Sequence, residues 1–481
     1  MRNLRLLRAL ALVAGLQSMV AWGQQLTPEQ LKIQELERKI EELDRRLSLA
    51  EAKTQGNAPA SPPLVAEPGP AAQTGATRPT NAGLPAGTIP VGEASNVGLV
   101  TAGPSGFTIR SADGDYLLKI GADLQIDMRT FTGAGSSALL DQILLRRVRP
   151  TFSGTIYKYI DYFLRPDFGQ GAVVIYDAYM QLNYIPHFAI RAGKFKPPVG
   201  LERLQSDDDT SFIERGLPTL LAPSRDIGFQ MSGDIVNRRL AYQIGVFNGV
   251  PDNSLSDASP SDHRSYAGRL FATPFEAGGE NPLSGLGLGF AAEGGNTDGI
   301  ALPAYKTAGQ NTFFNFNSGV ISAGHRTVLA PQAFYYLGPF GLLAEDTVAE
   351  EEFQKASLRK DVAFRSWQVE ASYILTGEKK SFGSPAPRHP FAPFNHGWGA
   401  WEIAARTGDF KVDQGLFNYG FASPTASPSF AREWMGGVNW YLNRILRISM
   451  DYAHTNFLGG AVGADRAAER VILARFQINF I

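Results

Sequence analysis

The chain has 481 residues, 44% of them hydrophobic, a formal net charge of −1 and no cysteine. The near-neutral charge argues against a nucleic-acid partner, because nucleic-acid binders normally carry a basic excess. The absence of cysteine excludes disulfide frameworks, thiolate zinc sites and thiol nucleophiles. The length would suit several soluble domains, although a β-barrel of this length can also form one unit.

The N-terminus carries the pattern of a secretory signal peptide. Basic residues precede the apolar run 9–20, and Ala21 and Gly23 offer small side chains for cleavage after Gly23. The run is shorter than the roughly 20 apolar residues that a transmembrane helix needs. Residues 1–23 are therefore predicted to be removed. Since no later segment could span as a helix, any membrane role of the mature chain must depend on strands.

Residues 24–53 are predicted to form a periplasmic helix. Thr27 can cap it, and apolar residues from Ile33 to Leu47 alternate spacings of three and four, as in a short coiled coil. Residues 27–53 could then bind peptidoglycan or a periplasmic protein; the alternative is a single amphipathic helix docked elsewhere. Residues 54–105 are rich in Pro, Ala and Gly and are predicted to be a disordered linker.

From residue 106 onward the apolar residues alternate with polar ones, as in β-strands. In Asp115–Phe131 the charged residues share one face and the Tyr, Leu and Ile residues share the other, and Val174–Tyr184, Leu446–Tyr452 and Arg470–Ile481 repeat the alternation. In Val174–Tyr184 the pattern puts Tyr176 on the apolar face. Because a charge facing lipid costs about 2–4 kcal/mol near the midplane, the charged faces are expected to face water.

The connections between these strands alternate between short and long. Tight turns are predicted at 157–159, 184–187, 236–239 and 441–444, with long loops such as 249–262 and 295–318 between them. Short turns at one end and long loops at the other are typical of outer-membrane barrels. Aromatic residues flank the turns, as in an interfacial girdle: Tyr157, Tyr159, Tyr184, Trp440 and Tyr441.

The pattern predicts an all-β chain: a transmembrane antiparallel β-barrel of about 16 strands over residues 106–481, with a short N-terminal coiled-coil helix. A soluble β-sandwich or propeller is the alternative, because strand alternation alone does not exclude it. The signal peptide, the amphipathic terminal strand and the two classes of connection favour the barrel.

The densest cationic feature is the segment that contains Arg146, Arg147 and Arg149. Arg147 and Arg149 share the polar face of their strand and should point into the lumen. Arg146 has the opposite parity and needs a rim position or a β-bulge to join them. Guanidinium groups keep their charge and offer a fixed fork of donors, so they can replace the hydration shell of an anion. The alternative is a salt-bridged wall without a ligand.

A long, partly apolar segment, 194–226, separates two strands and is predicted to fold into the lumen. It would bring carboxylates to a constriction opposite the arginines, namely Glu202, Asp207, Asp208, Asp209 and Glu214. Such an arrangement creates a transverse field that sorts solutes by charge. The alternative is a solvated acidic turn on the outer surface.

These residues carry a resemblance to the phosphate-selective porin O and P family. It rests on the arginine pair, on Asp177-Ala178-Tyr179, on G-K-F-K-P-P-V-G-L-E-R (193–203) and on F-I-E-R (212–215), within residues 107–481. The resemblance implies a 16-stranded trimeric porin whose third loop folds inward. It also implies that Arg146 and Arg147 match the family's arginine pair, Arg203 a basic position of the loop, and Asp177 an acidic site residue.

The chain departs from the family pattern in two places. Asp207, Asp208 and Asp209 stand where anion-selective members are basic, and Ile481 follows the terminal Phe480. The predicted pore-constriction and anion-binding set combines both lines of reasoning: Arg146, Arg147, Arg149, Asp177, Arg191, Glu202, Arg203, Asp207, Asp208 and Asp209.

The sequence therefore predicts a porin in the outer membrane of a Gram-negative-type bacterium, with its N-terminus periplasmic and lipid around the barrel. It would let small hydrophilic solutes or ions, anions and phosphate among them, diffuse passively, and it would form a homotrimer. The alternative is a structural tether that acts through the coiled coil. No cofactor is expected, and the six histidines show no metal-ligand spacing. A lipid hydrolase would need a serine-histidine pair that the sequence does not offer.

Overall fold

The computed structural model describes residues 98–133, 139–251, 257, 259, 261–276, 281–299 and 302–480. The predicted signal peptide, the coiled-coil helix, the linker up to residue 97 and Ile481 lie outside them. Among the described residues, no helix is long and apolar enough to cross a membrane.

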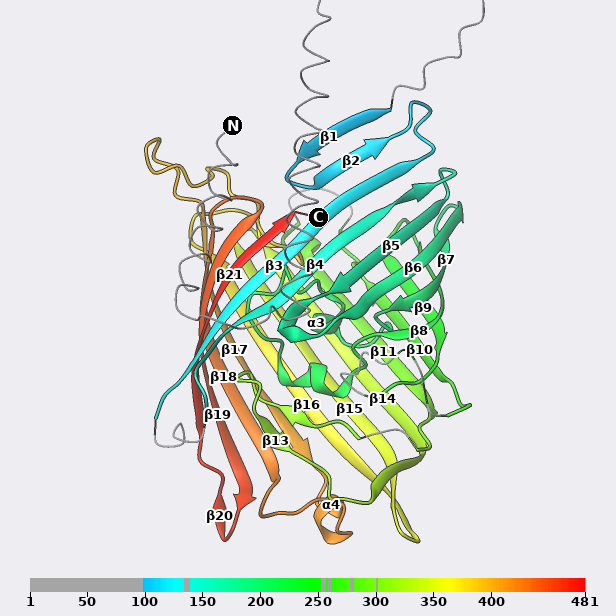
Figure 1. Cartoon of the computed structure of the whole chain (residues 1–481), viewed down its shortest axis with the longest axis vertical. Coiled ribbons are helices and arrows are strands. Elements are labelled where there is room, and N and C mark those ends of the chain that lie inside the picture. Colours follow the sequence, from blue (N-terminus) through cyan, green and yellow to red (C-terminus); the bar gives the residue numbers. More distant parts are fainter. Residues whose placement is uncertain are drawn as a thin grey trace, which may run out of the picture. The chain divides into compact units, whose positions relative to one another are not determined.

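The molecule is a closed antiparallel β-barrel of sixteen strands, which confirms the predicted fold class (Figure 1). Successive strands pair with each other, and β21 pairs with β3 to close the barrel. The barrel strands are β3 (Leu117–Phe131), β4 (Gln142–Ile156), β5 (Ile160–Asp167), β6 (Val174–Ile185), β7 (Phe188–Phe195), β8 (Asp226–Ile235), β9 (Leu240–Phe247), β10 (Ser265–Ala272), β11 (Leu286–Asn296), β14 (Val320–Leu337), β15 (Phe340–Lys355), β16 (Leu358–Ile374), β17 (Ala400–Val412), β18 (Pro428–Tyr441), β19 (Leu446–Ala461) and β21 (Glu469–Phe480).

Short elements decorate the barrel. They are β1 (Leu99–Gly103), β2 (Gly106–Arg110), η3 (Gly169–Gly171), α3 (Leu201–Leu204), η4 (Leu217–Leu221), η5 (Pro282–Gly285), β12 (Tyr305–Lys306), β13 (Thr312–Phe314), α4 (Gly415–Asn418) and β20 (Ala464–Asp465). The hairpin of β1 and β2 extends the sheet beside β3. Strand β1 therefore lies inside the stretch predicted as linker; it has no alternating apolar face, so the sequence pattern could not indicate it.

The closing seam carries a buried ion pair. Arg475 on β21 donates to both carboxylate oxygens of Asp127 on β3, with Nε–Oδ1 at 2.7 Å and Nη2–Oδ2 at 2.8 Å. Asp123 and Gln125 lie on the same buried face of β3, whereas Met128 is exposed on the other face. The polar faces line the lumen, as the sequence pattern predicts.

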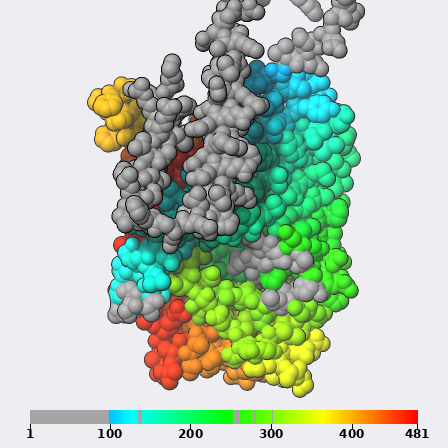
Figure 2. Space-filling model, viewed as in Figure 1, coloured from blue at the N-terminus to red at the C-terminus, as the bar shows by residue number. Residues whose placement is uncertain are grey.

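The two ends of the barrel differ as predicted. Tight turns connect β4 to β5, β8 to β9 and β18 to β19, and Tyr157 and Lys158 adopt positive φ values in the first of them. This short-turn end is at the top of Figure 1, and α4 and most of the long connections are at the bottom. The long connection between β16 and β17, residues 375–399, is an exception to the prediction, because it lies at the short-turn end. In the space-filling view, residues of the later strands form a packed rim at this long-loop end (Figure 2).

Aromatic pairs lie beside the tight turns. Tyr159 stacks on Tyr184 with ring centroids 4.9 Å apart, and Trp440 stacks on Trp401 at 5.0 Å. Tyr441 is different from the prediction, because its buried hydroxyl donates to Glu402 Oε2 at 2.7 Å. Trp440 and Tyr441 are consecutive residues of a strand, so only one of them can face outward.

Two segments fill the lumen. The first is the connection between β7 and β8, residues 196–225, called the inward loop below; it contains α3 and η4. The second is the hairpin of β12 and β13, whose Tyr305, Phe313 and Phe314 pack against Phe364 and Phe410 of the wall. The hydrophobic core of this barrel therefore lies inside it, between the wall and these segments.

Candidate functional site

A β-bulge turns Arg146 into the lumen. The register of β3 and β4 passes from Gln125–Arg147 directly to Ile126–Leu145, so Arg146 is an extra residue without a partner on β3. Its guanidinium reaches Glu214 of the inward loop, with Nε–Oε1 at 3.1 Å. The structure thus supplies the bulge that Arg146 needs to lie beside Arg147 and Arg149.

A second bulge brings in Tyr176, which the alternation placed on the outer face. The register of β5 and β6 passes from Arg165–Asp177 to Pro166–Ile175, leaving Tyr176 as the extra residue. Its ring is buried between two guanidinium groups, whose carbons lie 3.7 Å (Arg149) and 3.8 Å (Arg225) from the ring centroid. Proline cannot donate a ladder hydrogen bond and is typical of bulges, so Pro166 was the available signal.

The inward loop is anchored to the wall formed by β15–β19. The backbone N–H of Leu201 donates to Glu345 Oε2 at 2.6 Å, and that of Ile213 donates to Asp451 Oδ2 at 2.7 Å. Arg406 of β17 donates to the backbone oxygen of Glu214 at 3.0 Å. These contacts confirm the predicted inward fold and exclude the alternative of a solvated acidic turn.

This anchoring wall is acidic, which the sequence analysis missed. Five neighbouring strands each contribute a buried carboxylate, namely Glu345, Glu370, Glu402, Glu433 and Asp451. Each lies on the polar face of an alternating strand, but only the closed barrel places them side by side. Lys380 and Arg406 partly compensate them through ion pairs, at 2.6 Å to Glu402 and 3.3 Å to Glu433.

Glu202 of the inward loop faces this acidic wall and not the arginines of β4. Its carboxylate accepts from the backbone of Gly216 and from Gln368, both at 2.8 Å, and it pairs with Arg406 at 3.3 Å. The neighbouring Arg203 points the other way, donates to the backbone oxygen of Thr219 and lines the cavity described below. Glu202 and Arg203 are neighbours in the short helix α3, and their side chains therefore point to opposite sides of the inward loop.

The three aspartates have three separate environments. Asp207 forms ion pairs with Arg147 at 3.2 Å, with Arg149 at 2.6 Å and with Arg215. Asp208 accepts from Gln125 Nε2 at 3.2 Å, and Asp209 accepts from the backbone of Ser384 at 2.8 Å. The predicted field between an arginine wall and an acidic loop is thus corrected: the loop carboxylates contact the arginines directly.

Two carboxyl groups of the inward loop, those of Glu214 and Asp207, have a lowered pKa. Burial raises the pKa of Glu214, but the guanidinium of Arg146, helped by that of Arg129 at 3.4 Å, outweighs it and lowers the pKa to about 2. Burial also raises the pKa of Asp207, and Arg215, Arg147 and Arg149 together hold it well below its usual range. Both carboxylates are therefore charged at neutral pH.

A cavity of about 830 Å³ lies between β4, the inward loop and residues 302–310. Six basic side chains line it, namely Arg146, Arg147, Arg149, Arg203, Arg215 and Lys306, against three carboxylates, namely Asp167, Asp207 and Glu214. A second cavity of about 360 Å³ lies toward the short-turn end and is lined by Asp208, Asp209, Arg444 and Arg447 among others.

The boundary between the two cavities is a small polar cluster. Arg147 donates to Gln125 Oε1 at 2.5 Å, and Gln125 donates in turn to Asp208. Arg147 and Asp207 line the first cavity, whereas Asp208 lines the second. These side chains therefore connect the linings of the two cavities.

Asp177 and Arg191 lie outside the first cavity. Asp177 pairs with Arg225 at 3.1 Å, beneath the ring of Tyr176. Arg191 donates to Gln181 Oε1 at 2.9 Å and lies 4.2 Å from the ring centroid of Tyr179. The structure therefore brings Arg146, Arg147, Arg149, Arg203 and Asp207 together and separates Arg191 from them.

Known proteins are similar to this chain in sequence or in fold. The chain is 26% identical to Porin O of Pseudomonas aeruginosa over 382 residues, which cover 72% of this chain and 84% of that protein. The outer membrane channel DcaP of Acinetobacter baumannii superposes with a TM-score of 0.51 at 8% identity, over 78% of this chain and all of that one. The anion-selective porin of Comamonas acidovorans superposes with a TM-score of 0.49 at 11% identity, over 76% of this chain and 99% of that one.

The barrel, its inward loop and the arginine pair together agree with the resemblance found in the sequence. Residues 118–480 match the family of phosphate-selective porins O and P. The chain is consequently an outer-membrane channel, and it belongs to the phosphate-selective porin O and P family.

Proposed function

We propose that this porin lets small anions diffuse in preference to cations, and that they pass between β4 and the inward loop. The observation that supports this proposal is the excess of cationic side chains, six against three carboxylates, around the larger cavity. A passage lined by an excess of one sign concentrates the opposite ion.

The position of the acidic wall also supports a path for anions between β4 and the inward loop. The inward loop is hydrogen-bonded to Glu345 and Asp451, and the cavity beside Glu370 and Lys380 has a volume of about 10 Å³. The open volume lies on the opposite side of the loop, where the arginines are. Anions are therefore expected to meet guanidinium groups, while the carboxylates of the wall face protein.

The ion pairs at Asp207 would set the strength of anion binding. Conduction requires binding that is strong enough to replace hydration and weak enough to release the ion. Arg147, Arg149 and Arg215 pair with Asp207, and Arg149 pairs with Asp167 as well, at 2.7 Å. Three guanidinium groups therefore face two carboxylates, so positive charge remains at this position. The departure of Asp207 from the basic family pattern thus moderates the site and leaves it cationic; phosphate is one anion that could use it.

The test is the reversal potential of purified protein in planar bilayers under a salt gradient. Arg147→Ala should reduce anion preference severalfold in chloride and in phosphate, because it removes a charge at the boundary between the cavities. Arg191→Ala is the matched control, since Arg191 lies inside the same barrel but outside the cavity. Unchanged reversal potentials in Arg146→Ala, Arg147→Ala and Arg149→Ala would remove these residues from the path.

We also propose that the protein is a homotrimer, and the height of the wall supports this. Strands β5, β7, β9 and β10 have 8 residues each, whereas β14 has 18. Eight residues at about 3.4 Å each, tilted by about 40°, span only about 20 Å, less than the apolar band of about 25 Å. If the side of the barrel with the short strands were buried between the copies of a trimer, these strands would not need to match the thickness of the apolar band.

A further inference from the structure

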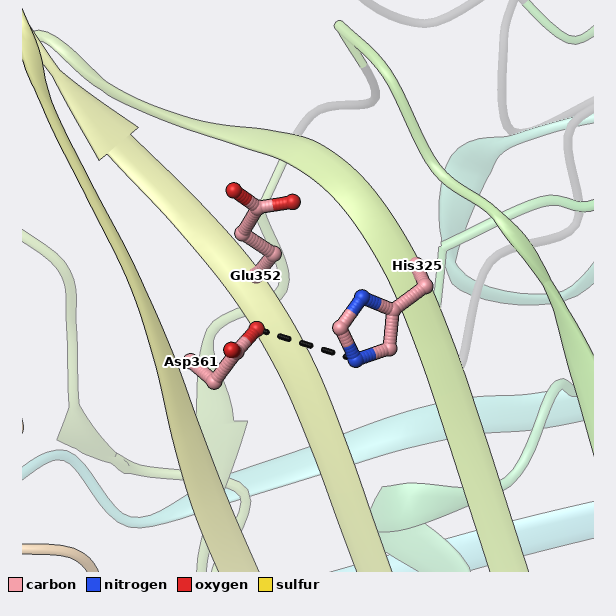
Figure 3. A group of neighbouring side chains, drawn as sticks. All are labelled: His325, Glu352 and Asp361. Atoms are coloured by element: carbon pink, nitrogen blue, oxygen red, sulfur yellow. Dashed lines mark ion pairs between the residues drawn. The ribbon is translucent and has the colours of Figure 1, made fainter.

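A group of metal-ligand residues lies on the outer surface of the barrel, away from the lumen. His325 of β14, Glu352 of β15 and Asp361 of β16 each offer one ligand atom, and these atoms lie within 4.8 Å of one another (Figure 3). Their neighbours in the sequence face inward: Arg326 and Glu351 form an ion pair in the lumen, and the side chain of Val362 is buried. The three side chains therefore point outward, near the long-loop end.

A bulge in β14 builds this group. The register of β14 and β15 passes from Ser322–Phe353 to Arg326–Glu351, so three residues of β14 oppose the single residue Glu352. Gly324 lies at the middle of the bulge, and a Cβ atom added to it would lie 1.8 Å from Glu352 Oε2. The glycine thus leaves the space that the carboxylate uses beside His325.

The spacing of the ligand atoms suits a metal ion better than a hydrogen bond. His325 Nε2 and Asp361 Oδ1 are 3.7 Å apart, beyond ordinary hydrogen-bond length. Two ligands of a tetrahedral zinc ion, with bonds of about 2.0–2.2 Å, lie roughly 3.4 Å from each other. Small side-chain rotations would bring the three atoms to that separation.

The local charge also favours a cation. Glu352, Asp361 and the nearby Asp298 carry three carboxylates, and Arg359 approaches two of them, at 3.5 Å (Glu352) and 3.6 Å (Asp298). Asp298 also contacts His263 at 3.1 Å. Asp361 lies beside His325, and no arginine or lysine of the described chain forms an ion pair with it. A divalent ion would compensate the remaining negative charge.

We propose that His325, Glu352 and Asp361 bind one divalent transition-metal ion such as Zn²⁺, with water completing the coordination. One imidazole and two carboxylates form a ligand set that zinc accepts. The ion would join three adjacent strands and hold the bulge of β14 in place. This site is independent of the anion path, because its ligands face away from the lumen.

The test is zinc binding to the purified full chain in detergent, after treatment with a chelator. Isothermal titration should show one zinc per chain, and His325→Asn and Asp361→Asn should each weaken binding at least tenfold. His454→Asn is the matched control, because His454 lies on the outer face of β19 beside Trp434 and Asn456. X-ray absorption at the zinc edge should show one imidazole in the coordination shell.

Two outcomes would overturn this proposal: binding below one zinc per chain at saturation, or equal loss in the His325 and His454 variants. Circular dichroism and heat-modifiable migration on gels check that each variant forms a barrel. Anion conductance should be unchanged in His325→Asn, so failure of the zinc site would leave the proposed porin function untouched.

Discussion

At the scale of single residues, Tyr176 organises the arginines of the cavity wall. Its ring separates the guanidinium groups of Arg149 and Arg225, which would otherwise repel each other. Each such contact contributes about 0.5–2 kcal/mol. Tyr176→Ala should therefore lower both thermal stability and anion preference, measured by circular dichroism and reversal potential. Tyr176→Phe keeps the ring faces and should stay close to the wild type; equal effects of the two changes would contradict this role.

Asp207 provides a second prediction at this scale. Asp207→Asn removes the carboxylate charge that Arg147, Arg149 and Arg215 share, so anion preference should rise severalfold and phosphate should block chloride current at lower concentration. Asp346→Asn is the control, because Asp346 of β15 pairs with the exposed Arg365 at 2.8 Å on the outer face of the barrel. A parallel increase in both variants would show a general charge effect instead.

Glu214 allows a prediction about pH. Its pKa is lowered to about 2, so the stability that its ion pairs contribute is present above its ordinary pKa and is lost as the pH falls through about 2. Between pH 8 and pH 4 the side chain keeps its charge. The difference in reversal potential between the wild type and Glu214→Gln should therefore be constant over this range. A difference that disappears near pH 5 would show that Arg146 does not control this carboxyl.

At the scale of elements, the inward loop owes its position to carboxylates of the wall. Asp451→Ala removes the acceptor of the Ile213 backbone N–H, which leaves a buried donor unsatisfied at a cost of about 1–3 kcal/mol. The loop should then fluctuate more, seen as noisier and larger single-channel conductance. Ser366→Ala is the control, since it removes a buried hydrogen bond to Asp409 within the wall. Equal current noise in both variants would show that the single-channel conductance does not depend on the anchoring of the inward loop.

The same elements show how far the sequence could predict the structure. Alternation predicted the strands and their lumenal faces, and parity alone indicated the bulge at Arg146. It misplaced Tyr176, because a bulge shifts the alternation by one residue. Tyr441 is misplaced for another reason: the sequence assigns it to the aromatic girdle because it flanks a turn, whereas its position next to Trp440 in the strand makes it face inward. The acidic wall and the pairs of Asp207 could not be predicted, since they join residues that only barrel closure brings together.

At the scale of the whole molecule, the wall is low over β5–β10 and high over β14. The proposed trimer predicts that unheated protein migrates as a trimer on gels and that multi-angle light scattering gives three chains per particle. Phe229→Arg and Met231→Arg place charges on the exposed face of the low wall and should dissociate the trimer. Leu329→Arg on the high wall is the control and should leave the oligomer intact. A monomer in mild detergent would contradict the proposal.

The ion pair between Arg475 and Asp127 has a consequence for biogenesis. Its members are 348 positions apart, at the two ends of the barrel sequence. Asp127 lies 4.0 Å from Arg146 as well, but it meets Arg475 only after the entire chain has been made and exported. A truncated polypeptide that lacks β21 would leave Asp127 without the two hydrogen bonds from Arg475 and β3 with an open strand edge, to which another chain can pair.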